Sequence, residues 1–263
     1  MPLGFKLGLW AGLCDKAEMR VEADLNSLQN IYLESLVPPG SATWQAGLVE
    51  AREQSRRLSK EGISVSPVEG QFLRFLFAQL AGPRVVEIGT LTGYSALWIL
   101  RGLLEASPEG PIEFATFENN PEHARIAREI LQRVESPSDG ALKIEVWEGD
   151  AREELQRWSQ KNQGQLLDGI FIDGPKAAYG EFLDWAEKHL RPGALVVADN
   201  VFLRGQVFDD SVPGTFSAKQ IQALRQFNLR LANPELYSAI FIPTVEGLAV
   251  ARFLGSQSAT KIV

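Results

Sequence analysis

Residues 84–100 read RVVEIGTLTGYSALWIL, and the fold of the chain is decided in this stretch. A short apolar run leads to Glu87, the chain turns through Gly89 and Gly93, and a second apolar run follows. This order predicts a buried parallel strand, a glycine loop and the start of a helix. Such units form nucleotide sites at the carboxyl edge of α/β sheets. The alternative is the same unit with glycines that serve tight packing alone.

The acid in this loop separates it from a dinucleotide-binding loop. The dinucleotide fingerprint is G-x-G-x-x-G, whereas this chain has E-x-G-x-x-x-G, with Glu87 at the first glycine position. A carboxylate there would repel a pyrophosphate at the helix N-terminus. It would attract a cationic adenosyl ligand, and S-adenosylmethionine carries an ammonium and a sulfonium but no phosphate. The loop therefore predicts a methyltransferase.

Composition limits the class of protein. The chain has 263 residues, of which 45% are hydrophobic and 22% charged, enough for a sizeable core. Its net charge of -7 argues against a nucleic-acid partner, because such binding needs clustered Lys and Arg. No apolar run approaches the ~20 residues of a membrane span. The single cysteine, Cys14, cannot form a disulfide within the chain, which is typical of a reducing compartment. We therefore expect a cytoplasmic protein that does not bind a membrane.

From Arg84 onward, strand-like and helical patterns alternate. The strand-like runs are Val85–Ile88, Phe114–Phe117, Ile144–Trp147, Gly169–Ile172 and Leu195–Ala198. The helical patterns between them are Tyr94–Glu105, Glu122–Val134, Ala151–Gln160 and Tyr179–Leu190. This alternation predicts a parallel sheet with right-handed crossovers.

The end of the chain has a different order of elements. A last helical pattern, Ala218–Leu231, precedes two strand-like runs, Tyr237–Ile242 and Leu248–Phe253. Their short connection makes these two strands antiparallel. We therefore predict an α/β fold with a doubly wound, mostly parallel seven-stranded sheet. Five parallel strands are joined by a C-terminal antiparallel pair, and helices cover both faces.

The residues before Arg84 predict an N-terminal helical extension. Val21–Leu36 has near-helical apolar spacing, and Thr43–Lys60 is a polar helix candidate. A further helix begins at Pro67 and runs to about Leu80. Ser66 with Glu69 three residues later forms a capping box at its start.

A carboxylate lies at the end of each of the five predicted parallel strands. These acids are Glu87, Glu118, Asp150, Asp173 and Asp199. Ligands of open parallel sheets bind beyond these strand ends, and an acid after the second strand typically holds ribose hydroxyls. Each acid singly could be a helix cap or a turn residue, and Asp150 could simply cap the helix at Ala151. Together they predict a cationic ligand, a metal ion, or both.

Three residues after the fourth and fifth strands form a candidate metal site. Asp173, Asp199 and Asn200 converge because neighbouring strands lie about 4.8 Å apart. Two carboxylates and an amide oxygen suit Mg²⁺, Mn²⁺ or Ca²⁺. Zinc does not fit, because we expect the two histidines, His123 and His189, to be surface residues of helices.

Lys176 follows Asp173 by three residues, in the loop where an acceptor would bind. A lysine beside a divalent cation is expected to have a lowered pKa and can act as a base. The alternative is a surface lysine or an ion-pair partner of Asp173.

Seven stretches of the chain, in order, resemble the metal-dependent class I O-methyltransferases, chiefly the caffeoyl-CoA O-methyltransferase-like family and, more distantly, catechol O-methyltransferase. They are SVSPVEGQFLRFL, VVEIGTLTGYSALWIL, FENNPEHARIAREIL, GDAREEL, GIFIDGPKAAY, LRPGALVVADNVFLRGQV and IPTVEGLAVARF. The resemblance runs from about Ile63 to Phe253. It implies an S-adenosylmethionine-dependent enzyme that methylates a phenolic hydroxyl.

The resemblance also implies roles for individual residues. In the family, the acid and glycine of the first loop hold the methionine part of the cofactor, which corresponds to Glu87 and Gly89. The acid after the second strand binds ribose, and the Asp-Ala pair after the third lies near adenine. The implied cofactor-binding residues are Val65, Glu87, Gly89, Thr90, Ser95, Glu118, Asn119, Asp150, Ala151 and Asp173.

The family's metal site corresponds to Asp173, Asp199 and Asn200, for which we expect Mg²⁺, with Mn²⁺ or Ca²⁺ as alternatives. Lys176 matches the proposed base of catechol O-methyltransferase, so the implied catalytic residues are Lys176 and Asp173. The expected reaction is in-line methyl transfer to a catechol-like oxygen that the metal polarises and orients.

Two departures from the family pattern concern the acceptor. The family usually has Asp-Ala-Asp-Lys where this chain has Asp173-Gly174-Pro175-Lys176, and its closing Asp-Gly is Glu246-Gly247 here. Caffeoyl-CoA is therefore not assumed as the acceptor. In relatives the N-terminal region covers the acceptor site. We thus divide the chain into a helical extension and acceptor-site cover (1–62) and an S-adenosylmethionine-dependent methyltransferase domain (63–263). By analogy alone, the resemblance suggests a homodimer.

Two other functions stay open at this point. One is an NAD-dependent oxidoreductase on a similar sheet, against which Glu87 in the first loop argues. The other is a catalytically silent S-adenosylmethionine-binding protein. The presence of Asp173, Lys176, Asp199 and Asn200 argues against that function.

Overall fold

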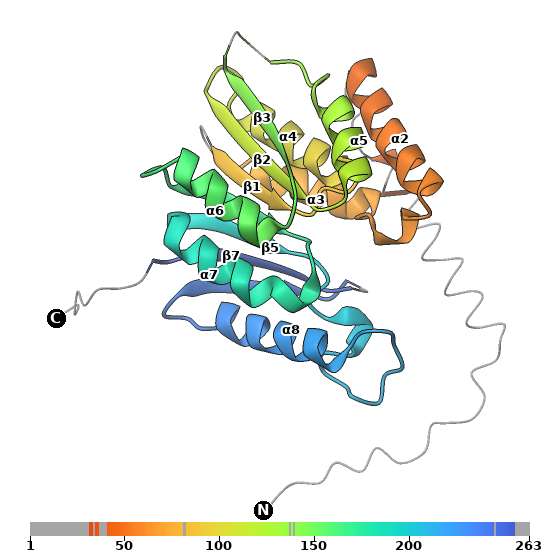
Figure 1. The fold of residues 1–263 in the computed structure, drawn as a ribbon, viewed down its shortest axis with the longest axis vertical. Coiled ribbons are helices and arrows are strands. Elements are labelled where there is room, and N and C mark those ends of the chain that lie inside the picture. Colours follow the sequence, from red (N-terminus) through yellow and green to blue (C-terminus); the bar gives the residue numbers. More distant parts are fainter. Residues whose placement is uncertain are drawn as a thin grey trace, which may run out of the picture. The chain divides into compact units, whose positions relative to one another are not determined.

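The computed structural model describes residues 32–33, 35–36, 41–80, 83–136, 138, 140–244 and 246–255 (Figure 1). The chain divides into two compact units, Met1–Pro39 and Gly40–Val263, and the second holds every element named below. Cys14 and most of the predicted helix Val21–Leu36 lie outside the described residues. The division that we predicted between residues 62 and 63 concerns function and stays a prediction.

A seven-stranded sheet of order β3-β2-β1-β4-β5-β7-β6 runs through the second unit. Its strands are β1 (Arg84–Ile88), β2 (Ile112–Glu118), β3 (Leu142–Glu148), β4 (Leu167–Ile172), β5 (Leu190–Ala198), β6 (Tyr237–Ile242) and β7 (Leu248–Phe253). Strands β1 to β5 are parallel, whereas β7 is antiparallel to both β5 and β6. The predicted doubly wound, mostly parallel sheet is confirmed.

Helices pack on the sheet in two groups, as right-handed crossovers require when strand order reverses between β1 and β4 (Figure 1). Helices α6, α7 and α8 contact one another in series, and α2, α3, α4 and α5 form the other group. The helices are α2 (Ala42–Arg57), α3 (Pro67–Phe77), α4 (Tyr94–Ala106), α5 (Pro121–Leu131), α6 (Ala151–Lys161), α7 (Tyr179–His189) and α8 (Ala218–Leu231), with short 3₁₀ turns η1 (Glu61–Ile63), η2 (Lys176–Ala178) and η3 (Leu203–Gly205). Among the described residues, none of the helices is long and apolar enough to cross a membrane.

Local capping explains where several helices begin. The predicted capping box is present in α3: Glu69 N donates to Ser66 Oγ (3.2 Å), and Ser66 N donates to Glu69 Oε2 (2.8 Å). The Asn120 side chain caps α5 by accepting from backbone N–H groups of its first turn. These caps satisfy N–H groups that lack partners within the helix.

Strand β5 begins at Leu190, five positions before the predicted Leu195. The register against β4 shifts between Leu167 and Gly169, and Gly193 takes a φ of 86°. A bulge therefore admits the Arg191-Pro192-Gly193 segment, which would otherwise interrupt a ladder. The sequence pattern placed the start of the strand after this segment, because proline and glycine are poor strand residues.

The central strands have continuous apolar sequences because both of their faces lie in the core. All six residues of β4 are buried, because helices cover both faces of the sheet there. Helices α3 and α4 cross closely at glycines: a Cβ on Gly70 would lie 2.4 Å from the Trp98 ring. This close packing positions the start of α3, with Val65 and Glu69, near the carboxyl edge of the sheet.

Candidate functional site

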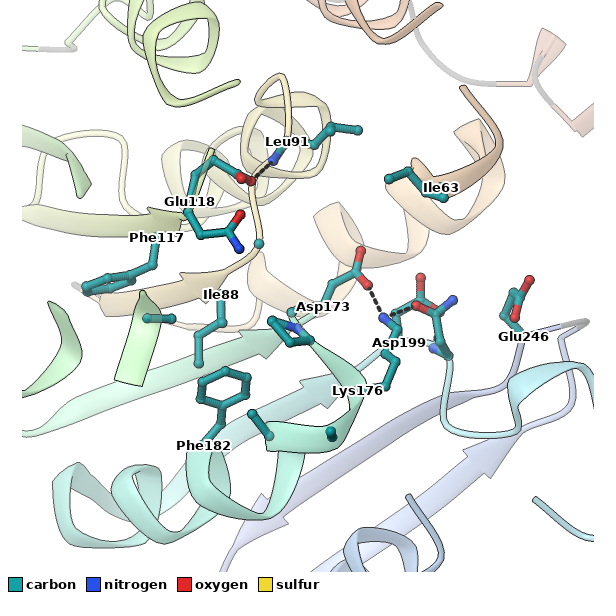
Figure 2. A pocket seen from close by; sticks show the side chains of 18 of the residues that line it. Ile63, Ile88, Leu91, Phe117, Glu118, Asp173, Lys176, Phe182, Asp199 and Glu246 are labelled. Atoms are coloured by element: carbon teal, nitrogen blue, oxygen red, sulfur yellow. Dashed lines mark hydrogen bonds and ion pairs between the residues drawn. The ribbon is translucent and has the colours of Figure 1, made fainter. Parts of the chain in front are cut away.

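A cavity of about 610 Å³ lies at the carboxyl ends of the parallel strands (Figure 2). It spans the gap between β1 and β4, where strand order reverses, which is the usual ligand position in such sheets. Most of the predicted site residues line it: Val65, Gly89, Glu118, Asn119, Asp150, Ala151, Asp173, Lys176, Asp199 and Asn200. Glu87, Thr90 and Ser95 are not part of this lining.

Glu87 lies beneath the first loop and is 0% exposed. Its carboxylate accepts hydrogen bonds from Ser95 Oγ and Thr116 Oγ1, both at 2.6 Å. Burial raises the pKa of Glu87 from 4.5 to about 7, although these two hydrogen bonds oppose the rise. Thr90 is also buried. These side chains therefore brace the loop, and their predicted contact with the cofactor stays a prediction.

The loop backbone approaches the end of β4 so closely that only glycine fits at position 89. Gly89 has a φ of 91°, and a Cβ there would lie 2.3 Å from the carbonyl oxygen of Asp173. Gly89 N donates to Phe117 O (2.9 Å), and Asp173 N donates to Ile88 O (2.8 Å). The loop is therefore bound to the strands on either side, and Gly89 and Leu91 face the cavity.

Glu118 connects the first loop to the start of α5. Its Oε2 accepts from Leu91 N and its Oε1 from Asn120 N, each at 2.9 Å. The carboxylate lines the cavity and keeps lone pairs for a ligand.

The expectation that His123 is a surface residue is wrong. It is 9% exposed and lines the cavity, with Nδ1 3.6 Å from Glu118 Oε1. The first turn of α5 packs at the strand ends, so a position that looks polar in the sequence faces inward. His189 is half-buried and stacks on Trp185.

Asp150 is a helix cap, as its alternative interpretation predicted, and it also lines the cavity. Its Oδ1 accepts from Arg152 N at 2.9 Å, and the Arg152 guanidinium forms an ion pair with Oδ2 at 2.5 Å. The hydrogen bond from this guanidinium keeps the pKa of Asp150 below its usual value. Arg152 lines the cavity too.

Asp173, Lys176, Asp199 and Asn200 come together as predicted, and Figure 2 shows this cluster at the end of β4 and β5. Lys176 Nζ donates to Asp173 Oδ1 (2.8 Å), to Asn200 Oδ1, and to the Tyr179 hydroxyl (3.0 Å). The Tyr179 hydroxyl donates in turn to Asp199 O at 2.8 Å. Asn200 takes a φ of 58°, and its N–H donates to Asp199 Oδ1 at 2.6 Å.

Charges in this cluster are strongly perturbed by burial. Burial raises the pKa of Asp173, although Lys176 opposes the rise. Burial and the neighbouring Asp173 carboxylate raise the pKa of Asp199. Burial alone would lower the pKa of Lys176, but Asp173 and Tyr179 raise it above its usual value. Two buried carboxylates share one ammonium, so the cluster is short of positive charge.

The donor set suits a hard divalent cation. Within the ranges that the structure describes, no group of three or more His, Cys, Asp or Glu side chains is arranged to hold a metal ion. The set here is different: two carboxylates and the amide oxygen of Asn200. A cation, the Lys176 ammonium, already lies within hydrogen-bonding distance of Asp173 and Asn200. Oxygen donors that gather around one cation fit the ligand preference of Mg²⁺, Mn²⁺ or Ca²⁺.

Several residues of the site were not predicted. Tyr179 does not line the cavity, but its hydroxyl accepts from Lys176 Nζ. It lies one helical turn after Lys176, and that spacing could have identified it. The unpredicted residues that line the cavity include Lys60, Ile63, Glu69, Arg204, Phe216, Lys219 and Glu246. Arg204 lies after β5 in sequence without a periodic pattern, and Lys219 lies in the first turn of the predicted helix α8. In Figure 2, Ile63 and Glu246 lie on one side of Asp173, and Phe117 and Glu118 lie on the other. We call these the acceptor end and the donor end.

Comparisons with known proteins agree with this geometry. The O-methyltransferase family matches residues 40–254. The chain is 31% identical to a catechol O-methyltransferase of Niastella koreensis, over 78% of this chain and 88% of that protein. An O-methyltransferase from Bacillus cereus in complex with SAH aligns with a TM-score of 0.68 and 29% identity, over 86% of this chain and 97% of that one. An O-methyltransferase of tomaymycin synthesis from Streptomyces achromogenes, in complex with SAM, aligns with a TM-score of 0.70 and 28% identity, over 86% and 96%.

Proposed function

The chain belongs to the O-methyltransferase family, and from this premise we propose that it methylates a phenolic small molecule with S-adenosylmethionine and a divalent cation. The acceptor is catechol-like or another phenol. One observation carries the proposal: a single cavity joins the loop after β1 and Glu118 to the oxygen cluster of Asp173, Asp199 and Asn200. The relatives in complex with SAM or SAH support the choice of cofactor.

The donor end would bind S-adenosylmethionine. We assign the ribose hydroxyls to Glu118, whose two oxygens are already oriented by Leu91 N and Asn120 N. Val65, Asn119, Asp150 and Ala151 line the same cavity and would surround the adenosine. Glu87, beneath the loop, would act on the cofactor's ammonium through its charge, together with Thr90 and Ser95. Gly89 lets the methionine part approach the backbone.

Asp173, Asp199 and Asn200 would hold the cation, for which we propose Mg²⁺. A bound dication lowers the pKa of an acceptor hydroxyl and fixes the position of its oxygen. Lys176 can accept the hydroxyl proton only after it has lost its own, and nearby positive charge favours that loss. Asp173 and Tyr179 hold the lysine nitrogen in place.

In the proposed reaction one bond forms, one bond breaks, and one proton is transferred. The acceptor oxygen forms a bond to the methyl carbon, while the carbon–sulfur bond breaks and its electron pair stays on sulfur. The hydroxyl proton goes to Lys176. Cavity residues would orient the two reactants in line and exclude water, which lowers the entropic part of the barrier.

A turnover screen tests the proposal. The protein is incubated with S-adenosylmethionine, a panel of phenols and Mg²⁺, Mn²⁺ or Ca²⁺, and methylated product is measured by mass spectrometry. We expect product with catechols, loss of product in EDTA, and unchanged cofactor binding by calorimetry. Asp199→Asn should reproduce the EDTA result, whereas the matched variant Asp184→Asn, on the outer side of α7, should not change turnover.

Full activity in EDTA would refute the metal role. Cofactor binding without any turnover would instead support the silent binding protein.

A further inference from the structure

The acceptor end of the cavity is formed in part by a strained turn after β5. Leu203 and Arg204 have φ values of 47° and 54°, and both side chains are bulky. Two successive non-glycine residues in the left-handed region are unusual and unfavourable. Such conformations persist only where the surrounding structure holds them, and they are common at functional sites.

The connection before β7 holds the turn. Phe202 N donates to Glu246 O (2.8 Å), and Val201 N donates to Gly247 O (3.0 Å). A Cβ on Gly247 would lie 2.4 Å from Phe202, so the two segments are in close contact. Backbone hydrogen bonds and close packing therefore fix the turn from outside the cavity. The turn held in this way directs the Arg204 side chain toward the cavity.

Arg204 lines the cavity and leaves most of its donors available. Its Nε donates to Glu246 Oε1 at 2.5 Å, and its side chain is 63% exposed. A guanidinium has five N–H donors, and this contact uses one of them. Glu246 thus acts as a brace that holds the guanidinium in place without covering it.

Two more cationic side chains line the cavity. Lys60 and Lys219 also line the cavity, and no ion pair engages either of them within the part of the chain that the structure describes. Of the acids that line the cavity outside the oxygen cluster, Glu246 pairs with Arg204, whereas Glu69 accepts from Ser66 N and keeps its charge. The metal and cofactor of the proposed function would add further positive charge.

We propose that Arg204 is a specificity-determining residue that selects phenolic acceptors carrying a carboxylate. The inference rests on the proposed function and names the substrate class of that site. A guanidinium matches the planar geometry of a carboxylate and binds it through paired N–H groups. Lys219, in the first turn of α8, and Lys60 add positive charge to the same cavity. Amine-bearing catechols would meet like charge there.

Kinetics on three catechols that differ in the charge of their ring substituent test the inference: neutral catechol, the carboxylated protocatechuate and the cationic dopamine. We expect the wild type to prefer protocatechuate. In Arg204→Gln, kcat/KM for protocatechuate should fall about tenfold or more, the range of a lost charge-assisted contact, while that for catechol changes less than about threefold. Arg204→Lys should restore part of the preference because it keeps the charge. Arg57→Gln is the matched control, because Arg57 is also 63% exposed and pairs with an acid, Glu53, outside the cavity.

Equal losses for protocatechuate and catechol in Arg204→Gln would overturn the inference, since Arg204 would then only maintain the turn. A wild-type preference for dopamine would overturn it as well. Calorimetric binding of the three acceptors, in the presence of SAH and Mg²⁺, separates this result from failure of the proposed function. Catechols that bind with no charge preference would refute the inference alone. Failure of every catechol to bind would refute both.

Discussion

Replacement of Glu87 by Gln should make the protein more stable at neutral and alkaline pH. Glu87, near the end of β1, is fully buried beneath the first loop, and burial raises its pKa to about 7 from 4.5. The carboxylate accepts from Ser95 Oγ and Thr116 Oγ1. Gln has the same shape and can accept from at least one of these hydroxyls, but it never carries a charge. The variant therefore removes the cost of ionising a buried carboxyl group.

The sign and size of the effect follow from linkage. The folded-state pKa lies above the unfolded value, so the folded protein holds the proton more tightly. The stability that this group contributes is complete below pH 4.5 and is lost as pH rises through 7. A shift of about 2.5 units corresponds to roughly 3 kcal/mol. The stability of Glu87→Gln relative to the wild type should therefore increase by about 3 kcal/mol between pH 4.5 and pH 8.

Urea denaturation followed by circular dichroism, at several pH values, measures this difference. Glu113→Gln is the control of opposite sign, because its hydrogen bond from Arg84 lowers the pKa of Glu113. That variant should lose stability relative to the wild type as pH rises from below pH 4.5 to neutral. A stability difference for Glu87→Gln that is independent of pH would refute the reasoning. Calorimetry with S-adenosylmethionine on the same variant should show weaker binding if the cofactor's ammonium interacts with this charge.

Three further variants and one control variant test how the cavity is held together and how it binds the cofactor. Tyr179→Phe removes the hydroxyl that accepts from Lys176 Nζ, so kcat should fall about tenfold while the cofactor Kd, measured by calorimetry, stays within twofold; a change in Kd alone would contradict the positioning role. Gly89→Ala introduces a Cβ 2.3 Å from a backbone oxygen at a positive φ, and should cost about 2 kcal/mol or more in urea denaturation. Gly47→Ala, in helix α2 with only ordinary contacts, should instead stabilise by about 0.5–1 kcal/mol. Glu118→Gln should weaken cofactor binding about tenfold, and an unchanged Kd would exclude Glu118 from the ribose contact.

Much of the site could be predicted because topology alone brings strand ends together. The five strand-ending acids were recognised by position, and four of them line the cavity: Glu118, Asp150, Asp173 and Asp199. The fifth, Glu87, ends its strand as predicted, but its side chain turns beneath the loop. The direction of the Glu87 side chain depends on the alternation along β1 and on the path of the loop. The hydrophobic pattern of the sequence gives neither.

Which side chains face the cavity at the acceptor end depends on contacts between segments far apart in the chain. Arg204 faces the cavity because Glu246, 42 residues later, pairs with it and holds the turn after β5. His123 faces inward because the start of α5 packs at the strand ends. No local pattern of apolar residues reports such contacts, because they join irregular segments.

The sequence by itself determined the order of strands and helices, the reversal of strand order that creates the cavity, and the set of acids at its edge. These features follow from short-range periodicity and from the few topologies that a parallel sheet allows. Only the tertiary structure decided which acid is buried, which ammonium lies among the oxygens of Asp173 and Asn200, and which cations line the cavity. Those outcomes depend on burial and on distances between remote side chains, and therefore on how closely the loops pack over the sheet.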